Sequence, residues 1–135
     1  MERTMEIPRQ GWSGYFEGLS RRAQGHALRI EVDAEDMGDQ ELVRELPLLG
    51  IELETKGSEV GAIEVMLGRD GSGYTHHIDV PTHIYVKTDA EGDLDCLSIE
   101  DDAGGKTLLF FEGEEGVPAW GMQGAPGAEE AATGP

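Results

Sequence analysis

Three histidines near the middle of the chain have the side chains best suited to chemistry. His76 and His77 are adjacent, and His83 follows beyond Pro81. Imidazole nitrogens, with carboxylates beside them, are common ligands of zinc and other transition metals. The spacing matches no recognised metal motif, however, and the proline leaves the direction of His83 undefined. We therefore predict no metal site and no cofactor, with histidines that form hydrogen bonds or face solvent. If a metal is bound, His76, His77 and His83 are the candidate ligands.

A single cysteine and a glycine-rich segment are the other features that catalysis could use. Cys96 lies in an alternating, strand-like run, which favours a buried thiol over a nucleophile. Residues 68–73 (GRDGSG) join two predicted strands and open no helix, so they lack the helix N-terminus that completes a phosphate-binding loop. No pair of catalytic carboxylates stands out among the 28 acidic residues. We predict no catalytic residue and no enzymatic activity.

The charge of the chain limits its partners. It has 28 acidic and 10 basic residues and a formal net charge of −18. Such a chain repels nucleic acids and anionic membrane surfaces. Three explanations of the excess stay open: a solvated surface that keeps the protein soluble, adaptation to high salt, or an acidic face that binds a basic protein or imitates a nucleic acid.

Cysteine usage and hydropathy indicate the compartment. One cysteine allows no disulfide within the chain, which favours a reducing environment. The first twelve residues contain no apolar run that would form a signal peptide. No stretch reaches the roughly 18 apolar residues of a membrane span. We expect a cytoplasmic protein.

One helix and a series of strands account for most of the chain. Residues 1–6 have no pattern and are expected to be loose. Residues 7–25 predict a helix that begins at Pro8 and ends at Gly25. Its apolar residues recur on one face and indicate a helix that covers a sheet; they are Trp12, Tyr15, Phe16, Leu19 and Ala23.

Alternating apolar and polar residues predict the strands. They are expected at residues 27–33, 45–55, 62–67, from 74 through a break at 80–82 to 86, at 95–100 and at 106–112. The acidic segment 34–44 is interpreted as a solvated loop. The pattern predicts an α+β fold that is mostly β, with an N-terminal helix packed on a curved antiparallel sheet or small barrel of about five or six strands.

A change in composition after Glu112 predicts the end of the globular domain. Residues 7–112 form the domain, and residues 113–135, rich in Gly, Ala, Pro and Glu, are expected to be a flexible acidic tail. An apolar group within this tail predicts docking, either back on the domain or on a partner. The candidate protein-binding residues are Val117, Pro118, Trp120 and Met122.

Four segments resemble a family of small bacterial proteins of unknown function. They are residues 7–12 (IPR, then Trp12), 46–51 (LPLLGI), 63–68 (IEVMLG) and 76–84 (HHIDVPTHI). The most specific are LPLLGI and an H-x-I-x-x-P-x-x-I pattern carried by His76, Ile78, Pro81 and Ile84. The resemblance covers about residues 7–112, implies one folded domain, and brings no activity or catalytic residue with it.

These observations predict a non-enzymatic accessory or protein-binding module. It would act through its acidic surface and the tail that carries Trp120, on a protein partner or on a second copy of itself. Two alternatives remain: a small-ligand or metal-binding protein that uses the histidines, and an acidic mimic of nucleic acid.

Overall fold

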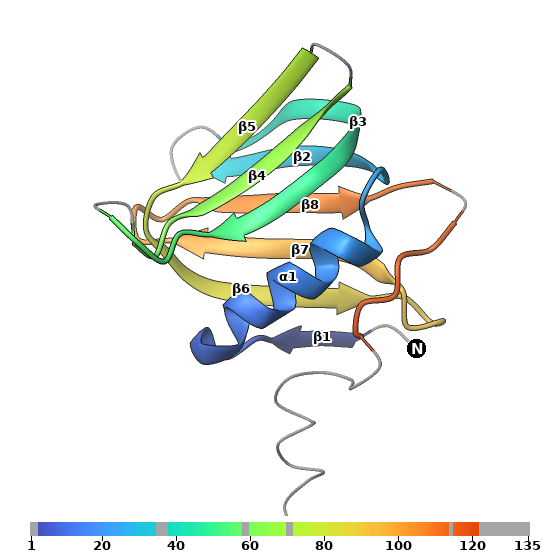
Figure 1. Ribbon diagram of the computed structural model, residues 1–135, viewed down its shortest axis with the longest axis horizontal. Coiled ribbons are helices and arrows are strands. Elements are labelled where there is room, and N and C mark those ends of the chain that lie inside the picture. Colours follow the sequence, from blue (N-terminus) through green and yellow to red (C-terminus); the bar gives the residue numbers. More distant parts are fainter. Residues whose placement is uncertain (1–2, 35–37, 58–59, 70–71, 114, 122–135) are drawn as a thin grey trace, which may run out of the picture.

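The computed structural model describes residues 3–34, 38–57, 60–69, 72–113 and 115–121 (Figure 1). One antiparallel sheet of eight strands and one helix make up the fold. The strand order is β1-β6-β7-β8-β2-β3-β4-β5. The helix α1 covers Trp12–Arg22 after a 3-10 turn at Arg9–Gly11, and the strands are β1 Arg3–Glu6, β2 Ala27–Ala34, β3 Gly38–Leu53, β4 Ile63–Arg69, β5 Ser72–Ile78, β6 Pro81–Thr88, β7 Leu94–Asp101 and β8 Lys106–Phe111.

The helix has the buried face that the sequence predicts. Trp12, Tyr15, Phe16 and Leu19 are all buried against the sheet. The indole N–H of Trp12 donates to the carbonyl of Ile7 at 3.0 Å, which fixes the start of the helix. The chain leaves the helix through Gly25, whose φ of +83° suits a residue without a Cβ. The apolar stripe therefore places α1, and its prediction as a helix that covers the sheet is confirmed.

The sheet is open, and it has more strands than the sequence indicates. The prediction of a mostly β fold with an N-terminal helix and a curved antiparallel sheet is confirmed, whereas the barrel and the count of five or six strands are wrong. Two elements make the difference. Residues 3–6, expected to be loose, pair with β6 as strand β1, and the break before Pro81 separates β5 from β6.

Strand β3 bends the sheet. It has 16 residues, of which the first part pairs with β2 and the second with β4. The pairing with β2 shifts register between Val43 and Leu46, and the φ of +58° at Glu45 marks a bulge there. The acidic segment 34–44 was expected to be a loop, but residues 38–44 belong to this strand. That expectation is wrong because the first part of β3, here called its arm, is mostly exposed on both faces. The arm is a strand because it pairs with β2, and a segment exposed on both faces has no alternating apolar pattern in its sequence.

Because of this bend, strands β4 and β5, at one end of the sheet, fold over its inner face. His76 on β5 forms a 3.1 Å hydrogen bond with the hydroxyl of Thr107 on β8, although β2, β3 and β4 lie between these strands in the sheet order. The aliphatic core fills the space between β4 and β5 on one side and the rest of the sheet on the other. Helix α1 covers this core where the strands leave it open, below β3 and in front of β7 (Figure 1).

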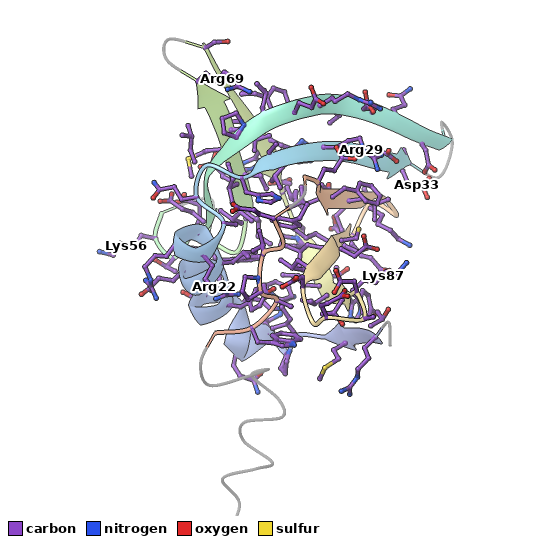
Figure 2. The ribbon with its side chains drawn as sticks, turned by 90° about the vertical axis from the view of Figure 1, so that its right-hand side faces the viewer. Arg22, Arg29, Asp33, Lys56, Arg69 and Lys87 are labelled. Carbon is purple, nitrogen blue, oxygen red and sulfur yellow. The ribbon has the colours of Figure 1, made fainter. Side chains whose placement is uncertain are left out.

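The other face of the sheet is charged. Figure 2 shows Arg29, Asp33 and Lys87 on the side of the molecule away from α1. The guanidinium of Arg29 lies 4.0 Å from the centre of the Phe110 ring and also binds the carboxylate of Glu112 at 3.0 Å. The guanidinium thereby covers part of this ring on the outer face of the sheet.

Candidate functional site

The three histidines point in different directions. His76 faces the inside of the fold and is bound to Thr107. His77 lies on the outer face of β5, with its ring nitrogens 3.5 Å from the Glu64 carboxylate and 3.8 Å from that of Asp79. His83, on β6, is bonded to a carboxylate oxygen of Glu6 on β1 at 2.8 Å. The structure therefore does not bring the three candidates together, and no cluster of three or more potential metal ligands occurs among the described residues.

Burial controls the protonation of two groups that might act in chemistry. Burial lowers the pKa of His76, and the neighbouring His77 lowers it further. Burial raises the pKa of the Cys96 thiol to about 11, and the carboxylate of Asp95 adds to this effect. A thiol with such a pKa stays protonated at neutral pH and is a poor nucleophile.

Three of the four candidate binding residues of the C-terminal segment lie in the part of the chain that the structure describes, and they take part in the fold. Val117 is buried, Trp120 is half-buried with its ring 5.6 Å from that of Tyr15, and Pro118 is exposed. Arg22, at the end of α1, donates from Nε and Nη2 to the carbonyls of Pro118 and Ala119 at 3.0 and 2.9 Å. The folded part of the chain thus extends past Glu112, to which the sequence analysis assigned the end of the domain. Met122 lies outside the described residues.

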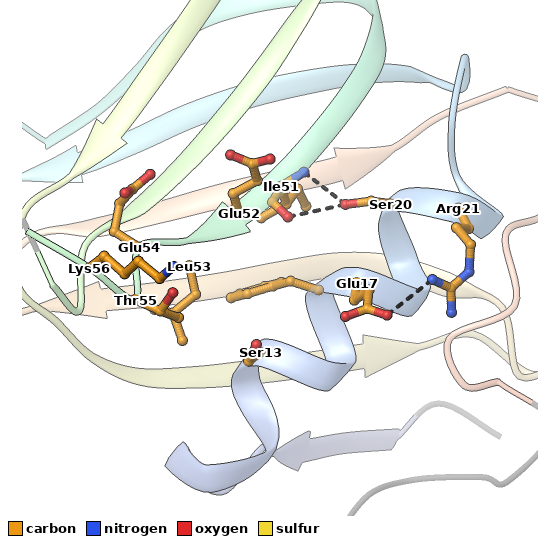
Figure 3. Close-up of a pocket in the computed structure, with 11 residues that line it drawn as sticks. Ser13, Glu17, Ser20, Arg21, Ile51, Glu52, Leu53, Glu54, Thr55 and Lys56 are labelled. Carbon is orange, nitrogen blue, oxygen red and sulfur yellow. Dashed lines mark hydrogen bonds and ion pairs between the residues drawn. The ribbon is translucent and has the colours of Figure 1, made fainter.

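A groove that the sequence analysis missed lies between α1 and the end of β3 (Figure 3). Its volume is about 550 Å³. The helix contributes Ser13, Phe16 and Glu17 from its first turns, then Ser20 and Arg21, and the opposite wall is formed by residues 51–56. Phe16 and Ile51 provide an apolar floor, while serine hydroxyls and charged side chains line the rim.

Ser20 fastens the helix to the strand at one end of this groove. Its hydroxyl oxygen accepts a hydrogen bond from the N–H of Ile51 at 2.9 Å and donates one to the carbonyl of Ile51 at 3.1 Å (Figure 3). The side chain of Ser20 therefore pairs with both backbone groups of Ile51, as a residue of a neighbouring strand would. Strand β2 has ended by this point, so α1 replaces it along the edge of β3.

Beyond Ser20 the edge of β3 is open. The N–H of Glu54 donates to the carbonyl of Ala62 at 2.8 Å, on the β4 side of the strand. Because successive residues of a strand direct their backbone groups to opposite sides, the N–H and C=O of Leu53 point toward the groove. No hydrogen bond joins either group to the part of the chain that the structure describes.

Acidic side chains predominate around the groove. Glu17 forms an exposed ion pair with Arg21 at 3.4 Å. Glu52 and Glu54 both point away from the core, whereas Leu53 between them points inward (Figure 3). The one lysine of the lining is Lys56, in the turn that follows. Ser13, Glu17 and Ser20 form a polar row beside the apolar stripe of the helix, the only trace of the groove in the sequence.

Comparison with known proteins gives the family of the chain. Residues 3–119 match the model of a family of unknown function, DUF5335. The chain belongs to this family. The resemblance to a family of unknown function is thereby confirmed, and membership in DUF5335 extends it to Val117 and Pro118, which the four sequence segments left outside.

A relative in this range supports the assignment. An uncharacterised protein of Aquifex aeolicus (strain VF5) is 30% identical over 106 residues, which cover 78% of this chain and 89% of the relative. No solved structure matches the chain. Within the described part of the DUF5335 chain, no helix is long and apolar enough to cross a bilayer.

Proposed function

We propose that the protein is a non-enzymatic binding module whose site is the groove between α1 and β3. The observation that carries this proposal is the open edge of β3 at Leu53, held beside an apolar floor. Exposed strand edges readily pair with other chains, and proteins commonly cover them. Here the helix covers the edge at Ile51 and leaves it accessible two residues later.

The charge of the molecule favours a basic partner. The chain carries −18 overall, and the groove has three carboxylates, of Glu17, Glu52 and Glu54, against the cations of Arg21 and Lys56. An acidic surface attracts basic segments at long range and repels acidic ones. The acidic surface predicted from the sequence thus becomes a means of choosing the partner in this proposal. The C-terminal segment, by contrast, supports the helix from the other side.

Selection from a random library of displayed 12-residue peptides tests the proposal. The bait is the full chain, and two variants with the same change in charge serve as comparisons. Ser13→Arg places a long cationic side chain in the groove, and Ser72→Arg places one on the exposed end of β5. We expect enriched peptides with more Lys and Arg than the input library. Their enrichment should be lost on S13R and retained on S72R.

Two results would contradict the proposal. One is the absence of any enriched sequence on the full chain. The other is equal enrichment on S13R and on the unchanged protein, because binding would then occur away from the groove. Thermal unfolding of both variants provides the control for folding, since both altered serines are exposed.

A further inference from the structure

We infer that the partner binds as an extended strand that pairs with β3 at Leu53. This inference rests on the proposed function and specifies how the groove recognises its partner. The N–H and C=O of Leu53 are one donor and one acceptor on the same edge, without a hydrogen-bond partner among the described residues. A strand that adds to a sheet uses such groups for affinity, whatever its side chains are.

Ser20 sets where the added strand can begin. Its hydroxyl already occupies the donor and acceptor of Ile51. The next residue with backbone groups on this edge is Leu53, followed by Thr55 if the chain continues extended. Glu17 of α1 lines the groove on the helix side, and Phe16 lies in its floor. The added segment is therefore short, with its pairing confined to residues 53–55.

The side chains around Leu53 predict the sequence of the partner. In a sheet, residues opposite each other point to the same face. A residue opposite Leu53 would point inward, where Leu53 packs against the core, and should be apolar. Its two neighbours would lie beside Glu52 and Glu54, which point outward (Figure 3). Opposite charges across a strand pair are favourable, so both neighbours should be basic.

The partner is thus an extended peptide with a basic–apolar–basic core. The two outer strands of the sheet, β1 and β5, do not line this groove. The overall charge of −18 acts in the same direction as Glu52 and Glu54. The recognition would be local and would depend mostly on the peptide backbone.

Titration of the full, isotope-labelled chain with one synthetic peptide tests the inference. The probe is acetyl-Thr-Lys-Val-Lys-Thr-amide, followed through the backbone amide resonances of the protein. We expect the largest shifts at Leu53 and Thr55, slower exchange of the Leu53 amide hydrogen, and weaker binding of the same peptide with Glu in place of Lys. S13R should remove these effects, whereas S72R should not.

Peptides with one methylated backbone nitrogen test the pairing itself. Because alternate residues of the added strand face β3, only one of two peptide nitrogens, that of the valine or that of the second lysine, can donate to Leu53. Methylation of that nitrogen should weaken binding, and methylation of the other nitrogen should be tolerated. The expected loss for the removed hydrogen bond is about fivefold. The first position corresponds to antiparallel and the second to parallel addition.

The outcomes separate this inference from the proposed function. Shifts confined to residues 51–56 without any difference between the two methylated peptides would leave a binding groove and overturn strand addition. No shift at Leu53 with millimolar probe would overturn the predicted basic–apolar–basic partner. The library selection described above decides independently whether the groove binds peptides at all.

Discussion

Replacement of Ser20 by alanine should detach the helix from the edge of β3. The substitution removes the two hydrogen bonds with the N–H and C=O of Ile51. At about 1 kcal/mol each, they contribute about 2 kcal/mol to the free energy of unfolding. Alanine recovers up to about 0.5 kcal/mol because it favours the helix. Ser13→Ala is the matched control, since Ser13 is an exposed residue of the same helix with no side-chain hydrogen bond to a described residue.

Urea unfolding followed by circular dichroism measures the difference. The unfolding free energy of S20A should be about 2 kcal/mol below that of S13A. In a domain of this size, that corresponds to a melting temperature lower by roughly 6–10 °C. The slope of the unfolding curve should not change, because both variants expose the same surface. If S20A is as stable as S13A, Ser20 does not fasten α1 to β3, and the groove loses one end.

Three further predictions concern the C-terminal segment, His76 and Cys96. Arg22→Met should lower the free energy of unfolding by about 2 kcal/mol, because two hydrogen bonds with carbonyls of that segment are lost. It should also shift the fluorescence of Trp120 to the red. Arg21→Met removes only an exposed ion pair and should change neither quantity. Since burial lowers the pKa of His76, the unfolded chain takes up a proton first on acidification, so stability should fall below about pH 6.5. This loss should be smaller in His76→Gln, and equal pH dependence would contradict it. With its pKa raised to about 11, Cys96 should react with iodoacetamide at pH 8 much more slowly than in the urea-unfolded chain, and equal rates would show an accessible thiolate.

Local patterns in the sequence predict the elements that are buried on one face. The stripe from Trp12 to Leu19 repeats at helical spacing, and β7 and β8 are apolar where they face the core. These residues are placed by the hydrophobic effect acting on each element. The helix and most of the strands can therefore be predicted from the sequence alone.

The remaining features depend on contacts between distant residues. The arm of β3 before Glu45 is mostly exposed, so only its pairing with β2 makes it a strand. The groove arises because Ser20 reaches Ile51, 31 residues further along the chain. Nothing in the composition of either segment specifies that contact. For Val117, the apolar group in the C-terminal segment predicted docking but did not decide between the domain and a partner.

The position of the C-terminal segment has a consequence for synthesis. Arg22 contacts Ala119, 97 residues later, and β1 pairs with β6, as far along as Thr88. During translation, the aromatic face around Tyr15 emerges early, but Ala119, in the segment that completes its cover, is made 97 residues after Arg22. The nascent chain therefore exposes an apolar surface while those residues are added, and intermolecular association competes with folding during this period. A message that ended before residue 115 would release a chain with that surface still open.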